Sequence, residues 1–148
     1  QDKLGVLSGD VLIHCGDMTS IETAQHMAGF EVIYVNGNVD EGHDSVRDAV
    51  WLLNPNVNET AETYSGSIDN VTIGVTHGHL YHELDKLIRS GKHDFVFHGH
   101  THRRRNDKIG NTRVINPGAL GGARHETRSI AILDLETHHI EFVHVSDF

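Results

Sequence analysis

Five side chains with metal-binding chemistry stand just after short apolar segments of the chain; they are Asp17, Asn38, His77, His100 and His102. We call them the five candidate ligands. Neutral imidazole is the commonest side-chain metal ligand, and carboxylate or amide oxygens complete many mixed sites. The last two belong to the stretch Phe97–His102, in which three histidines alternate and Gly99 permits a sharp backbone turn. Taken alone, this stretch is equally compatible with a polar turn that carries solvated histidines.

The bulk composition is that of one acidic globular domain. The chain has 148 residues, of which 37% are hydrophobic and 22% charged, and its net charge is −9 with histidine neutral. We therefore expect a single domain over residues 1–148 that has no general affinity for nucleic acids or anionic membranes. The oligomeric state is not set by the sequence, and a homo-oligomer is compatible with it.

The single cysteine, Cys15, allows no internal disulfide, so a reduced, cytoplasmic protein is expected. No apolar run approaches the length of a membrane-spanning helix, and no signal peptide is visible. We expect Cys15 to be a small buried residue rather than a nucleophile, because no base is identified for it.

The first part of the chain predicts a parallel strand–helix–strand unit. The apolar runs at 10–14 and 32–35 are typical of buried strands. Between them, residues 19–22 have the spacing of a capping box, and Gly29 marks the end of the predicted helix. The apolar face of this helix consists of Ile21, Ala24 and Ala28. Polar residues that follow two parallel strands should lie at one edge of the sheet.

The remaining chain is predicted to be rich in strands. They are expected at 61–65, 71–75, 95–97, 103–108, 112–115, 129–135 and 139–145. A helix is predicted from about Tyr81 to Gly91, and a shorter one within 44–53. The apolar face of the longer helix consists of Leu80, Leu84, Leu87 and Ile88.

The five candidate ligands are expected to converge, because the carboxyl ends of strands in an open α/β sheet line one crevice. A mixture of carboxylate, amide and imidazole ligands suits Mn, Fe, Zn or Ni. A central carboxylate can bridge two ions about 3.5–4 Å apart, an arrangement that recurs in phosphoester hydrolysis.

The ordered motifs around these residues resemble the calcineurin-like metallophosphoesterases. The matching blocks are Gly16-Asp17, Gly37-Asn38-Val39-Asp40, Thr76-His77-Gly78-His79, Gly99-His100-Thr101-His102 and Asn116-Pro117-Gly118. Within the family, the chain looks most like the small bacterial and archaeal phosphodiesterases. The resemblance implies an α/β (α+β) protein with a four-layer α/β/β/α sandwich of the metallo-dependent phosphatase type, here lacking its first strand. It implies a metal-dependent phosphoesterase, most closely a phosphodiesterase, that uses a hydroxide bridging two divalent metals.

The resemblance also implies a role for each candidate ligand. Asp17 would bridge both ions. Asn38, His77 and His100 would complete one site, and His102 would bind the other ion. Asp17, Asn38 and His77 would be the catalytic residues, the substrate would be a phosphoester, and the ions would be Mn, Ni, Fe or Zn.

Two departures from the family pattern bear on activity. The family begins with a strand ending in Asp-x-His or Asp-x-Asp, which supplies two ligands to the ion bound by His102, and nothing before Asp17 matches it. We therefore expect an N-terminal truncation with one incomplete metal site. Many members carry a general-acid histidine where this chain has Val39, so good leaving groups should be favoured. Asp40 or His79 could substitute for that acid.

These departures also favour an alternative function. A retromer subunit built on this fold works mainly as a protein scaffold, so the chain could be a catalytically impaired scaffold or a protein-binding module. A structural domain that holds one metal ion is a third hypothesis. Other histidines have simpler expected roles: His98 in the core, His79 at a helix cap or behind the ligands, and His138 and His139 in solvent.

Overall fold

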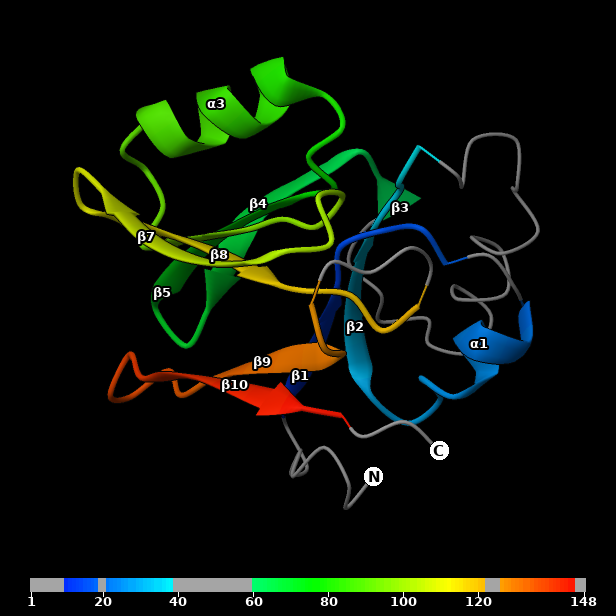
Figure 1. The fold of residues 1–148 in the computed structure, drawn as a ribbon. Helices are drawn as coiled ribbons and strands as arrows, with labels where there is room; N and C mark the ends of the chain where they lie inside the picture. Colours follow the sequence, from blue (N-terminus) through cyan, green and yellow to red (C-terminus); the bar gives the residue numbers. More distant parts are fainter. Residues whose placement is uncertain (1–9, 19–20, 39–59, 122–125, 146–148) are drawn as a thin grey trace.

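The computed structural model describes residues 10–18, 21–38, 60–121 and 126–145, which form stacked sheets and helices (Figure 1). The strands are β1 Val11–His14, β2 Glu31–Val35, β3 Thr60–Ala61, β4 Thr63–Ile68, β5 Val71–Thr76, β6 Phe95–Phe97, β7 Arg104–Ile109, β8 Thr112–Pro117, β9 Ser129–Leu133 and β10 Ile140–His144. The helices are α1 Ile21–Gln25 and α3 Tyr81–Arg89. Within these ranges no helix is both long and apolar enough to cross a membrane.

The strands form three sheets. The first is parallel with the order β1-β2-β3, and the second is mixed with the order β4-β5-β6-β8-β7. The third is the antiparallel pair β9 and β10. Helix α1 connects the parallel strands β1 and β2, and α3 connects the parallel strands β5 and β6. The predicted strand–helix–strand unit is thereby confirmed, and the loops after these strands leave the carboxyl edges of two sheets.

Strand β6 shows how the sequence separates the two faces of the five-stranded sheet. Phe95 and Phe97 belong to the main core, which also receives residues of β2, β5, β8 and β10. Val96 points to the other face and packs beneath α3. Successive strand residues face opposite sides of a sheet, so three apolar residues in a row serve two cores. The helical residues of the second core are Leu84, Leu87 and Ile88.

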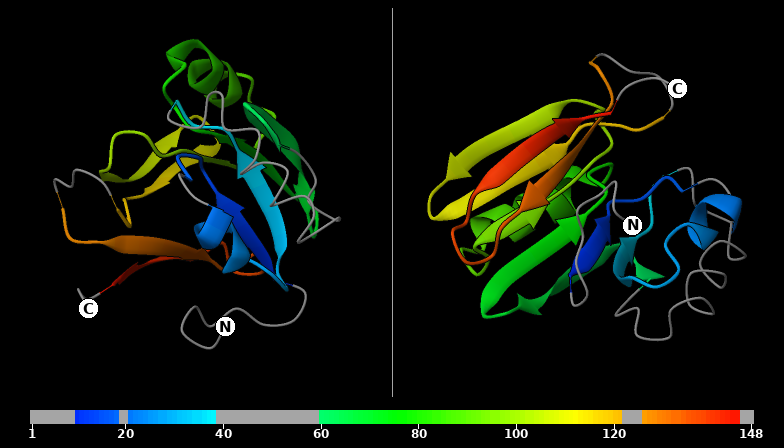
Figure 2. Two further views of the ribbon diagram at one scale, coloured as in Figure 1. Left: turned by 90° about the vertical axis from the view of Figure 1, so that its right-hand side faces the viewer. Right: turned by 90° about the horizontal axis from the view of Figure 1, so that it is seen from below.

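A third cluster covers the outer face of β2. It consists of Met18, Ala24, Met27, Phe30, Val32 and Tyr34. The layers are therefore α3, the five-stranded sheet, the two smaller sheets and α1 (Figure 2). This arrangement confirms the predicted α/β/β/α sandwich.

Several predicted boundaries were wrong. Helix α1 ends at Gln25 rather than Gly29, because Met27 N and Ala28 N donate to carbonyls three residues back, as in a tightened turn. Ala28 is therefore exposed, and Met27 is buried in its place. Leu80 is 38% exposed at the N-cap of α3. The expected capping box at 19–22 and the short helix at 44–53 involve residues outside the described ranges.

The strand expected at 61–65 lies further along the chain, as β4 at Thr63–Ile68. The turn that ends it is formed by Asp69 and Asn70, whose φ angles are 47° and 66°. Gly66 is a strand residue rather than part of the turn. The hairpin expected around Gly110 is confirmed as β7 and β8.

Candidate metal centre

Four of the five candidate ligands meet where β1, β2, β5 and β6 end; they are Asp17, Asn38, His77 and His100, here called the four-residue cluster. His77 Nε2 lies 3.1 Å from Asp17 Oδ2 and 3.0 Å from Asn38 Oδ1. His100 Nδ1 lies 3.1 Å from Asn38 Oδ1 and 3.2 Å from His77 Nε2. The fifth, His102, is half-buried two residues after His100 on the same loop.

Two glycines allow the loops after β1 and β2 to come this close. A Cβ on Gly16 would lie 2.6 Å from the Gly37 nitrogen and 2.9 Å from His77 Nδ1. A Cβ on Gly37 would collide with the Asp17 carboxylate. Gly16 also has a φ of 98°, a conformation that glycine adopts without steric cost. Both glycines are therefore needed for Asp17 to reach His77.

Three of the candidate ligands have left-handed backbones. The φ angles are 61° at Asp17, 66° at His100 and 56° at His102. Non-glycine residues rarely adopt positive φ, and such residues gather at functional sites because the surrounding structure must hold them there. Thr101 N donates to Gly99 O at 2.8 Å, so His100 is the central residue of a three-residue γ-turn.

The hydrogen bonds of His77 determine which of its two ring nitrogens carries the proton and which presents a lone pair to the four-residue cluster. Nδ1 lies 2.6 Å from the Cys15 carbonyl oxygen. A carbonyl can only accept, so Nδ1 carries the proton and donates. Burial is the largest influence on His77 and lowers its pKa, although the Cys15 hydrogen bond and the Asp17 charge act in the opposite direction. The neutral ring therefore presents the lone pair of Nε2 to two oxygen acceptors.

This donor set fits a divalent cation. Facing lone pairs repel one another unless a proton or a cation lies between them. Ligands about 2.1 Å from one ion are separated from their neighbours by about 3.0–3.4 Å, and the four contacts measure 3.0–3.2 Å. Within the described ranges, no three His, Cys, Asp or Glu side chains are placed to hold an ion.

His79 has an unusual environment beside the cluster. Both of its ring nitrogens are buried and without a hydrogen-bond partner. Its ring centroid lies 5.4 Å from that of His77 and 6.2 Å from that of His100. Helix α3 has no side-chain cap, so the expected capping role was wrong. An unbonded buried polar group costs about 1–3 kcal/mol, so it calls for a ligand or water.

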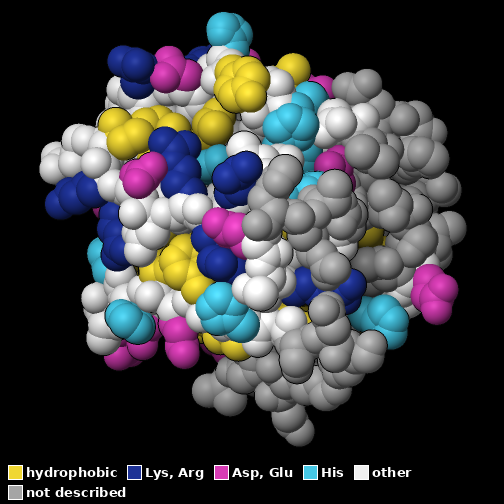
Figure 3. Space-filling view, in the orientation of Figure 1, with side chains coloured by type: hydrophobic (Ala, Val, Ile, Leu, Met, Phe, Trp, Pro, Cys, Tyr) yellow, Lys and Arg dark blue, Asp and Glu magenta, His cyan; other side chains and the backbone are white. Residues whose placement is uncertain are grey.

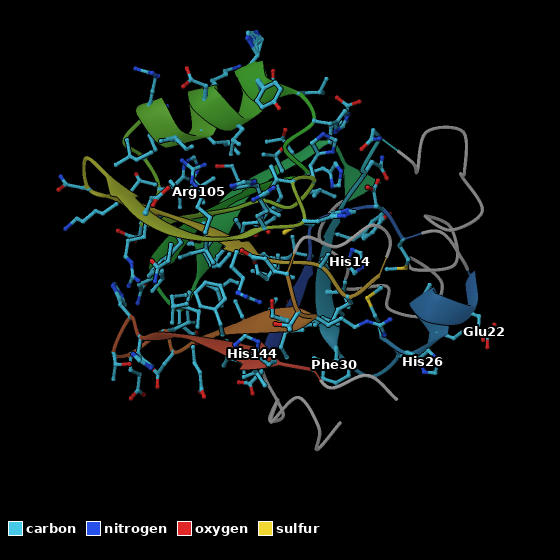
Figure 4. The ribbon with its side chains drawn as sticks, viewed as in Figure 1. His14, Glu22, His26, Phe30, Arg105 and His144 are labelled. Carbon is cyan, nitrogen blue, oxygen red and sulfur yellow. The ribbon has the colours of Figure 1, made fainter. Side chains whose placement is uncertain are left out.

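His98 has the structural role expected from the sequence, whereas Cys15 is only partly buried where it packs against the main core. His98 is 3% exposed, its Nδ1 donates to Gly99 O at 3.1 Å, and its Nε2 lies 3.3 Å from Nη1 of Arg105 on β7 (Figure 4). Burial lowers the pKa of His98 to about 4 and raises the pKa of Cys15 to about 12. A thiol with that pKa supplies no nucleophilic thiolate near neutral pH. The expected exposure of His138 and His139 is also confirmed.

Asn116 is a functional candidate whose role the sequence did not reveal. Its place in the Asn-Pro-Gly block was the only signal. The side chain is 0% exposed and bonds to the loop that carries His100. Contacts of this kind join residues far apart in the chain and follow from the tertiary structure alone.

Comparison with known proteins connects this geometry to a family. Residues 4–138 match the calcineurin-like phosphoesterase superfamily domain. A phosphodiesterase of Methanocaldococcus jannaschii is 32% identical over 130 residues, covering 86% of this chain and 77% of that protein. The structure of an archaeal phosphodiesterase matches with a TM-score of 0.84 and 29% identity, covering 92% of this chain and 83% of that chain.

A more distant structure bears on the scaffold hypothesis. The zinc complex of Vps29 from Entamoeba histolytica matches with a TM-score of 0.56 and 18% identity, covering 91% of this chain and 97% of that one. At this identity the likeness concerns the fold alone.

Proposed function

The chain belongs to the calcineurin-like phosphoesterase superfamily and is a metal-dependent phosphoesterase, and we propose that it hydrolyses a phosphodiester at the four-residue cluster. The observation that carries this location is the His77 ring, whose Nε2 faces the oxygens of Asp17 and Asn38 while its Nδ1 donates to Cys15. Two oxygen acceptors around the lone pair of His77 Nε2 form a set of donor atoms that suits a cation.

In this proposal the four-residue cluster holds one divalent ion, and Asp17 and His102 contribute to a second. Mn, Ni, Fe and Zn all suit the mixed donor set. When bound, such ions lower the pKa of a coordinated water and offset the charge of the phosphoryl group. The Cys15 carbonyl keeps the proton on Nδ1 of His77, which leaves Nε2 available as a ligand.

His79 is assigned to the substrate side of the same site. Its two ring nitrogens are unbonded and its ring lies near those of His77 and His100. A neutral imidazole can donate one hydrogen bond, and a phosphoryl oxygen is a suitable acceptor. Val39 and Asp40 lie outside the described residues, so the preference for good leaving groups stays a prediction.

The partners and location are proposed from composition. The net charge of −9 disfavours general nucleic-acid binding. On the face drawn in Figure 3, Lys and Arg side chains are interspersed with acidic and histidine side chains. A cytoplasmic location is proposed from the single cysteine.

The test is hydrolysis of an aryl phosphodiester with Mn²⁺ or Ni²⁺. We expect Asp17→Asn and His100→Ala to lower kcat/KM by at least about 10²-fold, because each removes a group that positions the reaction. His139→Ala is the matched control, since this histidine is exposed. Equal rates in all four proteins would contradict the proposed site. A wild-type protein without metal-dependent turnover would instead favour the scaffold hypothesis.

A further inference from the structure

Asn116 uses its whole side chain to hold two neighbouring loops. Nδ2 donates to Gly99 O and to Thr101 Oγ1, each at 3.0 Å. Oδ1 accepts from Gly118 N, also at 3.0 Å. The residue lies near the end of β8 and is 0% exposed. A fully bonded and fully buried amide is a rigid attachment point.

The two groups that Nδ2 contacts are the two ends of the γ-turn centred on His100. Gly99 supplies the carbonyl of that turn and Thr101 its amide, and the central φ is 66°. A γ-turn with a positive central φ is rare and strained, and it persists only when other contacts impose it. Asn116 bridges the turn from one end to the other.

Backbone bonds hold the chain up to the start of this turn and again from Arg104, where β7 begins to pair with β8. His98 N donates to Ile115 O at 3.0 Å, and Gly99 N donates to His77 O at 2.9 Å. Beyond Gly99, the bond from Nδ2 to Thr101 Oγ1 continues the attachment to β8. Without it, the turn can relax toward negative φ and carry the His100 ring away from Asn38 and His77.

We propose that Asn116 is a positioning residue for metal binding: it holds the strained turn that keeps His100 in the four-residue cluster. This inference rests on the proposed role of His100 as a metal ligand. Residues that orient metal ligands typically change metal affinity or activity by about 10–100-fold when they are mutated. The expected signature is weaker metal binding that exceeds what a loss of stability alone would produce.

The test measures the Mn²⁺ dissociation constant by competition with a chromophoric chelator. Asn116→Ser removes both donors, and we expect the constant to rise by about 10–100-fold. Thr101→Val removes one acceptor on an exposed side chain, so the variant should fold, and we expect a smaller rise. Thr101→Ser keeps the hydroxyl and should restore the wild-type constant.

Thr112→Val is the control for a purely structural effect. Thr112 lies on the same strand, is 1% exposed, and donates from Oγ1 to His93 O at 2.7 Å. The Thr112→Val substitution should lower the free energy of unfolding and leave the Mn²⁺ dissociation constant unchanged. Equal affinities for Thr101→Val and Thr101→Ser would overturn the proposal, even if Asn116→Ser does not fold. A wild-type protein that binds no Mn²⁺ would overturn the metal site itself, and this role with it.

Discussion

At the scale of single residues, the position of Asp17 depends on the missing side chain of Gly37. A Cβ there would collide with the Asp17 carboxylate, and backbone surrounds the same position. We therefore expect Gly37→Ala to displace Asp17 and to lower kcat/KM by about 10²-fold, the usual effect of misplacing a reacting group by about 1 Å.

The control for this substitution is Gly121→Ala. A Cβ on Gly121 would meet no atom within 4 Å. The activity of the Gly121→Ala variant in the aryl phosphodiester assay should equal that of the wild type. Full activity of Gly37→Ala would show that the close approach of the two loops is not required.

At the scale of elements, the β4–β5 hairpin depends on two left-handed residues. Asp69 and Asn70 have φ angles of 47° and 66°, which are the signs required by a type I′ turn. Asn70→Val should lower the free energy of unfolding by about 1–2 kcal/mol, because a β-branched side chain is strained at this φ. Asn70→Gly should leave the free energy of unfolding equal to that of the wild type or higher.

Urea denaturation measures the free energy of unfolding of both variants. The hairpin lies outside the four-residue cluster, so Mn²⁺ affinity should be unchanged in each. A Val variant as stable as the Gly variant would contradict the assigned turn.

The elements that the sequence predicted well are those with a strong local signal. Helix α3 has apolar residues at helical spacing, and β6 is a short apolar run before a turn. The end of α1 was missed because the burial of Met27 and Phe30 against β2, rather than local propensity, decides where the chain turns. The end of β4 was missed because Gly66, a frequent turn residue, is accommodated in the strand, which continues to Ile68.

At the scale of the whole molecule, a bound ion should link distant parts of the fold. The four-residue cluster joins loops that follow strands of two different sheets. An ion that binds only the folded state stabilises it by about 2.7 kcal/mol at 100 times its dissociation constant. We expect Mn²⁺ to raise the urea midpoint of the wild type accordingly and that of His100→Ala much less. Equal shifts in both proteins would place the binding elsewhere.

Much of the candidate site could be predicted because the topology of an α/β sheet collects the ends of its strands. Asp17, Asn38, His77 and His100 meet for that reason. The tautomer of His77 and the bridge from Asn116 could not be predicted, because each depends on a contact with a distant residue. The first contact joins two sheets and the second joins the ends of neighbouring strands of one sheet, and periodicity along the chain encodes neither.

The central claim is that Nε2 of His77 and Nδ1 of His100 share one divalent ion while Nδ1 of His77 keeps its proton. Nitrogen-15 NMR of the imidazole rings, recorded during a titration with Zn²⁺, tests it most directly. We predict that these two nitrogens shift together at one equivalent of metal, that Nδ1 of His77 stays protonated, and that the exposed His139 ring is unaffected. Unshifted nitrogens in His77 and His100, or loss of the Nδ1 proton of His77, would contradict the account.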